Sequence, residues 1–245
     1  MSATSILASL GTAAGIAMAL SPLPTIRTIV RCKSTGDFSV FPYIATLCQC
    51  ALWIGYAVTT SKTALIPVNA LVSILEFSYC VIFILFASDR PSIIKTISYP
   101  IAITGAAVAV SFISSAPSKF FGFFAVISNI IMYAAPLTVV KTVIETKSVE
   151  YMPLLLSLVG TVAAAIWTAW AISAVDYFVL IPNVLGFILG CIQLAVYFKY
   201  RNASSLTGTG EETIPTIDTT PDIESGKTSS KNFGSERTGL IRASN

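Results

Sequence analysis

The sequence predicts an all-α integral membrane protein with seven transmembrane helices, arranged as two parallel three-helix repeats joined by a linker helix. Apolar residues make up 54% of the 245 residues and charged residues only 11%, and the mean hydropathy is +0.78. This composition is typical of membrane proteins and not of soluble domains. Two further observations support the prediction. Seven stretches reach the roughly 20 apolar residues that cross a bilayer, and a set of residues recurs at a fixed distance along the chain.

The seven apolar stretches define the expected bundles. The first has no Lys or Arg ahead of it and no small-residue cleavage site, so we expect a retained helix and not a signal peptide. Residues 1–90 would form the first three-helix bundle, residues 91–117 the linker helix and residues 118–201 the second bundle. Residues 202–245 are rich in Ser, Thr, Gly, Pro and charge, which predicts a disordered cytosolic tail. The predicted spans lie at about 5–27, 38–60, 64–87, 93–115, 120–141, 152–174 and 177–199.

An internal duplication is visible when the chain is compared with itself. Matching residues in the two halves are separated by 114 positions, which is the difference between 136 and 22 and between 183 and 69. Because an odd number of spans separates the copies, both enter the membrane in the same direction. Transporters commonly hold their substrate between two such repeats, near the middle of the bilayer. The matching pairs are Pro22 and Pro136, Lys33 and Lys147, Trp53 and Trp167, and Asn69 and Asn183.

The positive residues predict the orientation. Nine Lys and Arg residues flank the spans on one side and two flank them on the other. The side rich in positive charge faces the cytosol, so we expect the N-terminus outside and the C-terminus in the cytosol. The basic residues form no single patch with interleaved aromatic residues, so we expect no nucleic-acid partner. The nine are Arg27, Arg31, Lys33, Arg90, Lys95, Lys141, Lys147, Lys199 and Arg201, and the two are Lys62 and Lys119.

Two amides and two indoles are candidates for a central substrate site. Asn69 and Asn183 lie inside apolar spans, where an unpartnered amide costs roughly 2–7 kcal/mol. A hydroxyl-rich ligand would supply partners, because a carboxamide both donates and accepts. Trp53 and Trp167 are paired in the same way, and an indole face stacks on the C–H face of a sugar. The structural alternative is interhelical hydrogen bonding for the amides and the interfacial aromatic belt for the indoles.

Prolines and helix-end residues are candidate moving parts. A proline near the cytosolic end of a span removes an amide donor and loosens one turn, although a single such proline more often marks a helix boundary. Tyr56, Lys62 and Asp176 fall at the outer helix ends, where a hydrogen bond or ion pair could close a gate. The candidate hinges are Pro22, Pro42, Pro136 and Pro153.

Glu76 is the only carboxylate deep within an apolar span, which makes it a candidate functional group. It could couple protons to transport, or it could hydrogen bond to a neighbouring helix. Its counterpart in the second repeat is Gly190, and the chain contains no His to complete a proton relay. The lack of His also removes the usual general base and the commonest metal ligand. We therefore expect no enzyme activity, no metal and no cofactor.

Short motifs occur in both halves of the chain. They are Ser-Pro-Leu-Pro-Thr (21–25), Lys-Ser-Thr-Gly-Asp-Phe-Ser (33–39), Pro-Tyr (42–43), Leu-Trp-Ile (52–54), Met-Tyr-Ala-Ala-Pro-Leu (132–137), Thr-Lys-Ser-Val-Glu-Tyr-Met-Pro (146–153) and Ile-Pro-Asn (181–183). Over about residues 5–201 the chain resembles the SWEET (MtN3/saliva) sugar transporters. The resemblance implies two triple-helix bundles joined by an inversion linker helix, uniport of mono- or disaccharides by facilitated diffusion, and homo-oligomers in the membrane.

The resemblance also assigns residues. The four prolines match the proline tetrad of the family, Asn69 and Asn183 its paired pocket asparagines, and Tyr56 and Asp176 its outer gate. The two paired tryptophans, Trp53 and Trp167, match its aromatic pocket positions.

Further pocket positions suggest the substrate. The resemblance places two of them at Met18 and Gly15 and their repeat equivalents at Met132 and Asn129. Members with Asn and a bulky Met in the second pair resemble the hexose-preferring branches, because the larger side chain narrows the cavity. We therefore expect a hexose such as glucose in preference to sucrose.

Two pocket positions depart from the family. Gln49 stands where Ser or Asn is frequent, and its repeat counterpart is Ala163. Neither repeat contains the Pro-Gln dipeptide of the wider PQ-loop group, which includes amino-acid exporters, and this favours the sugar branch.

Three functions stay open at this point. The first is a passive sugar facilitator in the plasma membrane or, as an alternative, in the vacuolar or another endomembrane. The second is a proton-coupled transporter of small solutes, such as the amino-acid transporters of the PQ-loop type. The third is a seven-helix receptor or scaffold whose cytosolic tail recruits partners.

Overall fold

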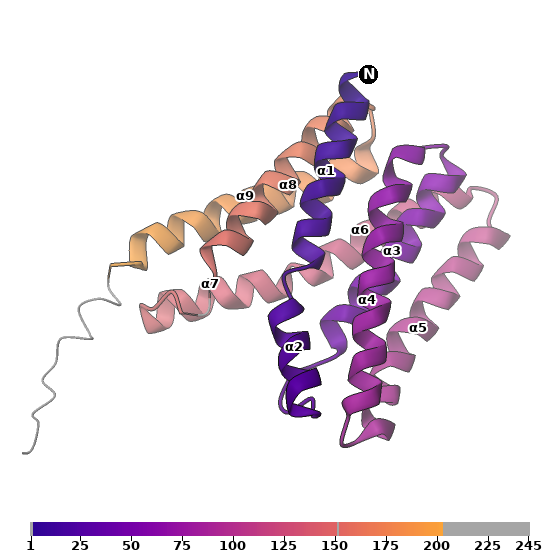
Figure 1. The fold of residues 1–245 in the computed structure, drawn as a ribbon. Helices are drawn as coiled ribbons and strands as arrows, with labels where there is room; N and C mark the ends of the chain where they lie inside the picture. Colours follow the sequence, from indigo (N-terminus) through magenta and orange to yellow (C-terminus); the bar gives the residue numbers. More distant parts are fainter. Residues whose placement is uncertain (1, 151, 203–245) are drawn as a thin grey trace, which may run out of the picture. The chain divides into compact units, whose positions relative to one another are not determined.

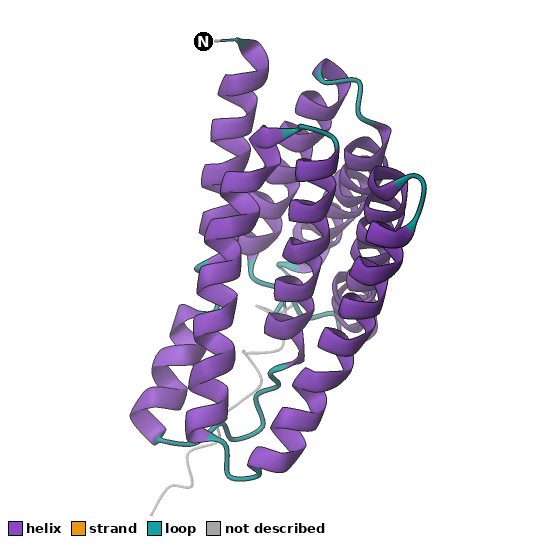
Figure 2. Cartoon of the chain, turned by 90° about the vertical axis from the view of Figure 1, so that its right-hand side faces the viewer, coloured by secondary structure: helices purple, strands orange, loops and turns teal. Residues whose placement is uncertain are grey.

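The computed structural model describes residues 2–150 and 152–202, which form nine α-helices and one short 3-10 helix and contain no β-strand (Figure 2). Among them, seven helices or helix pairs are long and apolar enough to cross a membrane, which confirms the predicted fold class. All the described residues fall in the first of two compact units, Met1–Thr209. The predicted tail lies outside the described residues, except for Asn202. The helices are α1 (Ala3–Ala19), α2 (Leu23–Cys32), α3 (Phe41–Thr59), η1 (Thr63–Leu65), α4 (Ile66–Phe86), α5 (Arg90–Ile113), α6 (Pro117–Met132), α7 (Ala134–Thr146), α8 (Leu154–Ser173) and α9 (Tyr177–Tyr200).

The first and fifth spans are broken helices, and both are longer than predicted. The first runs over Ala3–Cys32 with a break between α1 and α2, and the fifth over Pro117–Thr146 with a break between α6 and α7 (Figure 1). The predicted ends at 27 and 141 were too early. Hydropathy falls where Arg27 and Arg31 enter the sequence, but both residues are exposed on a helix that continues beyond them.

The two repeats share unusual backbone turns. Lys33 and Lys147, which follow α2 and α7, both adopt the left-handed conformation, with φ of 51° and 57°. Ser61 and Val175 do the same, with φ of 56° and 50°. Both pairs obey the 114-position offset, and residues other than Gly rarely adopt this conformation. The duplication therefore extends to the backbone of the loops.

Contacts between helices follow the repeat. Helix α4 packs against α1, α2 and α3, and α9 packs against α6, α7 and α8. The repeats meet along two seams, one between α1 and α8 and the other between α3 and α6, and the repeat relation exchanges these seams. Helix α5 packs against α3, α4 and α6 and so links the two bundles. This arrangement is that of parallel repeats around a pseudo-twofold axis.

Glycines allow close approach along both seams. A Cβ atom at Gly11 of α1 would lie 2.7 Å from the Trp167 ring of α8. A Cβ atom at Gly55 of α3 would lie 2.3 Å from the Phe121 ring of α6. Small residues serve this purpose at many helix interfaces in membranes.

The buried core is shared at one end of the molecule and divided at the other. We call the end at which the chain turns through 60–62 and 174–176 the Asp176 end, and there one cluster combines residues of both bundles, including Trp53 and Trp170. At the opposite end, which we call the Lys33 end, the first bundle has its own cluster around Phe83 and the second a separate cluster around Val143. The described helices α2 and α7, which lie at this end, make no contact with each other.

Candidate functional site

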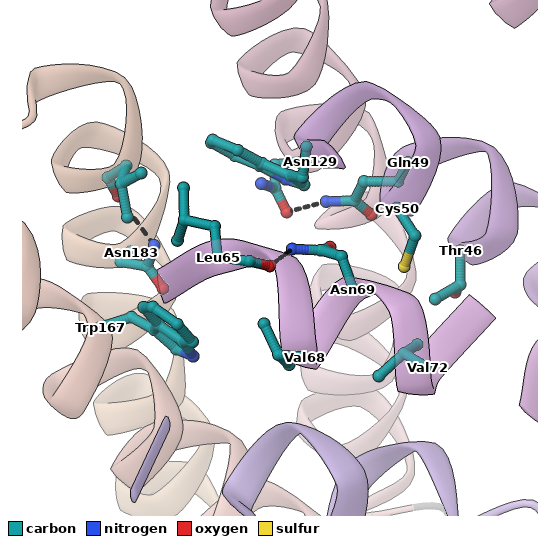
Figure 3. Close-up of a pocket in the computed structure, with 12 residues that line it drawn as sticks. Thr46, Gln49, Cys50, Leu65, Val68, Asn69, Val72, Asn129, Trp167 and Asn183 are labelled. Carbon is teal, nitrogen blue, oxygen red and sulfur yellow. Dashed lines mark hydrogen bonds between the residues drawn. The ribbon is translucent and has the colours of Figure 1, made fainter. Parts of the chain in front are cut away.

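A cavity of about 220 Å³ is lined by residues from both bundles (Figure 3). Its size suits a small solute or several water molecules. Six of the eight predicted substrate-binding residues line it, namely Gln49, Trp53, Asn69, Asn129, Trp167 and Asn183. The other lining residues are Thr46, Cys50, Leu65, Val68, Val72 and Val179.

Asn69 and Asn183 have the same geometry in the two repeats. Each side chain donates from Nδ2 to the carbonyl oxygen four residues earlier on its own helix, Leu65 and Val179 respectively, at 2.8 Å. One N–H of each amide is therefore used within its own helix, through Nδ2. Each Oδ1 and the second N–H stay available to a ligand in the cavity.

A second pair of amides joins the two repeats at the cavity wall. Gln49 of α3 donates from Nε2 to Oδ1 of Asn129 on α6 (Figure 3). The residues belong to the seam between α3 and α6, so this hydrogen bond crosses from one repeat to the other.

The two tryptophans lie between the cavity and the Asp176 end. Trp53 is buried and packs edge to face against Tyr56, with ring centroids 5.7 Å apart. Trp167 packs in the same way against Trp170, at 5.6 Å. Each indole lines the cavity and is held by a neighbour on its own helix.

Polar contacts between the two bundles lie at the Asp176 end. The Tyr56 hydroxyl donates to Oδ1 of the buried Asp176 at 2.8 Å, and the same oxygen accepts from the Val179 amide at the start of α9, at 3.2 Å. Lys62 lies 3.7 Å from Oδ2 of Asp176 and donates to the Ala174 carbonyl at 2.8 Å. Tyr56 and Lys62 come from the first repeat and Asp176 from the second, so these contacts tie the repeats together.

The prolines lie towards the Lys33 end. Pro42 falls in the first turn of α3 and Pro153 immediately precedes α8, which are the boundary positions that proline favours. Pro22 immediately precedes α2 and Pro136 lies in the first turn of α7. Only this second pair lies at breaks within spans.

A tyrosine fastens each helix break to the neighbouring helix. Tyr79 of α4 donates to the carbonyl of Ala19, where α1 ends, at 3.0 Å. Tyr133, at the break between α6 and α7, donates to the carbonyl of Pro182 in α9 at 2.5 Å. Gly186 makes room for this second contact, because a Cβ atom there would lie 2.6 Å from the Tyr133 hydroxyl. Sequence reasoning missed both tyrosines, since the partner in each case is a backbone atom on another helix.

Two predicted pocket residues do not line the described cavity. Met18 lies beside α8, with its methyl carbon 3.5 Å from where a Cβ atom of Gly160 would be. Met132 is the last residue of α6, one turn beyond Asn129 in the direction of the break. Both methionines therefore lie outside the lining of the cavity, towards the Lys33 end.

Helical spacing could have found most of the unpredicted lining residues. Val68 and Val72 of α4, and Leu65 at the end of η1 just before it, lie at intervals of three and four residues along the chain on the side that carries Asn69. Thr46 and Cys50 share the face of α3 that carries Trp53. These apolar and small side chains carry no chemical signal of their own.

Glu76 is buried in the first bundle and does not line the cavity. Its Oε2 has no hydrogen-bond partner among the described residues. The described part of the chain contains no group of three His, Cys, Asp or Glu residues that could hold a metal ion.

Comparison with known proteins identifies the family. The model of a family described as "Sugar efflux transporter for intercellular exchange" matches residues 5–91 and, a second time, residues 119–205. The chain belongs to this family, MtN3/saliva. The double match coincides with the two repeats, and the family is one of transporters and not of enzymes, as predicted.

Curated MtN3/saliva proteins match most of the chain. It is 36% identical to bidirectional sugar transporter SWEET16 of Arabidopsis thaliana, over 84% of this chain and 93% of the relative. It is 38% identical to bidirectional sugar transporter SWEET1b of Oryza sativa subsp. indica, over 75% of this chain and 74% of the relative. A solved structure of a eukaryotic SWEET transporter matches with a TM-score of 0.75 and 30% identity, over 82% of this chain and all of that one. These matches confirm the predicted family and the integral membrane fold.

Proposed function

We propose that this protein carries sugars across a membrane in both directions by facilitated diffusion, with hexoses such as glucose as the preferred substrates. The observation that carries the proposal is the pair of equivalent amides, Asn69 and Asn183, in one cavity shared by two repeats. The names of the relatives, which are bidirectional sugar transporters, support sugars as the substrate class.

The cavity has the chemistry that a sugar requires. Asn69 and Asn183 each present an Oδ1 acceptor because one N–H is already used within the helix, so sugar hydroxyls would donate to them. Trp53 and Trp167 supply apolar ring faces for the C–H surface of a pyranose. The lining contains no charged side chain, which suits a neutral solute and needs no cofactor.

Transport would proceed by alternating access. The contacts of Tyr56 and Lys62 with Asp176 hold the repeats together at one end, while the cores at the other end are separate. We propose that the sugar enters from the Lys33 end, that the repeats rock about the breaks at Pro22 and Pro136, and that the Asp176 end then opens. Flux follows the sugar gradient because no step consumes energy.

We propose that the Lys33 end faces the cytosol and that the N-terminus lies outside, which the excess of Lys and Arg residues at the Lys33 end supports. We propose the plasma membrane as the location, with the vacuolar membrane as the alternative, and a homo-oligomer as the functional assembly. The hexose preference rests on Asn129 in the cavity and on the two methionines, Met18 and Met132, towards its Lys33 end.

Sugar flux in proteoliposomes tests the proposal. Purified protein is reconstituted, and the uptake of labelled glucose and sucrose is followed with and without a pH gradient. We expect glucose uptake that exceeds sucrose uptake and does not depend on the pH gradient. The double variant Asn69→Ala with Asn183→Ala should lose uptake and still elute as folded protein.

Gln193→Ala is the matched control, because Gln193 shares α9 with Asn183 but does not line the cavity. It should transport like the wild type. No uptake of either sugar by the wild type would count against the sugar assignment, and amino-acid transport and the receptor or scaffold function would be tested next.

Proton-coupled transport is the second candidate, and one observation favours it. The buried Glu76 carboxylate has an oxygen without a hydrogen-bond partner among the described residues. Under this candidate uptake follows the pH gradient, and Glu76→Gln abolishes that dependence. Uptake that is unaffected by the gradient rejects it.

A further inference from the structure

The hydrogen bond between Gln49 and Asn129 has no counterpart in the other seam. The repeat relation exchanges Gln49 with Ala163 and Asn129 with Gly15, and neither counterpart has a polar side chain. The seam between α3 and α6 therefore carries two amides beside the cavity, whereas the seam between α1 and α8 carries none at the equivalent positions.

Close packing at Gly15 leaves no room for a side chain in the seam between α1 and α8. A Cβ atom at Gly15 would lie 2.7 Å from a methyl carbon of Val68, and Val68 itself lines the cavity. Even an alanine at this position would displace the cavity wall. The duplicated fold thus encloses a cavity whose lining includes two amides from one seam and no residue at the equivalent positions of the other.

The bridge also determines what Asn129 offers to a ligand. Its Oδ1 accepts from Gln49, and Figure 3 shows its amide nitrogen on the side turned away from Gln49. Asn129 can therefore present N–H donors to the cavity. Asn69 and Asn183 differ from Asn129, since each has used one N–H within its own helix and keeps Oδ1 free as an acceptor beside its second N–H.

We infer that Gln49 is a positioning residue that acts through Asn129, fixing its amide so that one sugar hydroxyl must accept a hydrogen bond there while others donate to Asn69 and Asn183. The inference rests on the proposed function, because it concerns how the same cavity orients a sugar. It makes recognition directional, because the equivalent positions of the other seam, Gly15 and Ala163, carry no polar side chain and do not line the cavity.

Modified sugars can test which hydroxyl accepts a hydrogen bond from the protein and which hydroxyls donate to it. At a given carbon, a deoxy sugar can neither donate nor accept, whereas a deoxyfluoro sugar can still accept weakly but cannot donate. At the hydroxyl that accepts from Asn129, the fluoro sugar should bind better than the deoxy sugar, by roughly 2- to 12-fold in KM. At the hydroxyls that donate to Asn69 and Asn183, both substitutions should raise KM.

The experiment measures KM and the maximal rate for glucose and for each monodeoxy and monodeoxyfluoro glucose in proteoliposomes. Gln49→Met keeps the length of the side chain and removes its hydrogen bonds. This variant frees the Asn129 amide, so the KM ratio at the one fluoro-tolerant carbon should move towards one while the ratios at other carbons stay the same. Asn129→Leu should change the ratio at the same carbon, which keeps the test valid if Gln49→Met inserts poorly.

The outcomes separate the two proposals. If the wild type transports glucose but has no fluoro-tolerant carbon, or if both variants leave every ratio unchanged, the positioning role is wrong and the proposed function stands. A uniform rise in all KM values would also reject it, since that result describes general damage to the cavity. If the wild type transports no sugar, both proposals fail together.

Discussion

Replacing Tyr56 by Phe removes one hydroxyl from the Asp176 end and leaves the ring packing in place. The hydroxyl donates to a buried carboxylate at 2.8 Å, and a hydrogen bond to a charged group contributes about 1.5–3 kcal/mol. The bond joins the two repeats, so it exists only while this end is closed. Its loss should raise the ratio of open to closed molecules roughly 10- to 150-fold, because about 1.4 kcal/mol corresponds to a factor of ten.

Cys50 provides a reporter for this equilibrium, because it lines the cavity. The measurement uses a background in which the other four cysteines are replaced by alanine, and a membrane-impermeant thiol reagent is applied only at the Asp176 end. While the closed state dominates, the labelling rate is proportional to the open fraction, so Tyr56→Phe should speed labelling by the same factor. The replaced residues are Cys32, Cys48, Cys80 and Cys191.

Tyr177→Phe is the control, since Tyr177 lies next to Asp176 in the sequence but is exposed. It should label at the wild-type rate. If Tyr56→Phe labels no faster than this control, the contact with Asp176 does not hold the end closed, and the assignment of a gate there is refuted.

Other substitutions follow from the same packing. Gly55→Ala should destabilise the seam between α3 and α6 and lower the melting temperature. Gly105→Ala adds a Cβ atom with no other atom within 4 Å and should stabilise α5 by about 0.5–1 kcal/mol. Equal effects of the two variants would contradict the close packing of α3 against α6 at Gly55. Gly186→Ala should impair transport because the new methyl group meets a tyrosine hydroxyl, and adding Tyr133→Phe should restore part of the activity. No rescue in the double variant would mean that this contact is not the cause. Lys62→Met removes the hydrogen bond to the Ala174 carbonyl at 2.8 Å and the ion pair at 3.7 Å with the buried Asp176, so it should speed Cys50 labelling by roughly tenfold or more. Labelling at the rate of the Tyr177→Phe control would show that Lys62 does not hold this end closed.

The spans could be predicted from the sequence because their physical cause is local. A bilayer selects about 20 apolar residues wherever they occur, and the duplication is visible as a fixed offset. The breaks at Pro22 and Pro136 were predicted as loosened turns because proline lacks an amide donor. The helical continuation through Arg27 and Arg31 was missed, since hydropathy marks where a chain leaves the apolar layer and not where its helix ends.

The cavity residues that could be predicted from the sequence are those that recur in both repeats. Asn69 and Asn183 could be paired because polar residues in apolar spans are conspicuous. The bond from Gln49 to Asn129 could not be predicted, because it depends on which helices form the seam and on how closely they approach. The same limit applies to the hydroxyl of Tyr133, whose partner is a backbone carbonyl on α9.

In the proposed transport cycle, the shared core at the Asp176 end would link stability to opening. Residues of both bundles form that cluster, whereas the clusters at the other end belong to one bundle each. Opening the Asp176 end therefore separates part of the same apolar surface that keeps the whole chain folded, and opening the Lys33 end does not. The state open at the Asp176 end should consequently be the less heat-resistant one, and a ligand that favours it would lower the melting temperature relative to one that favours the state described here.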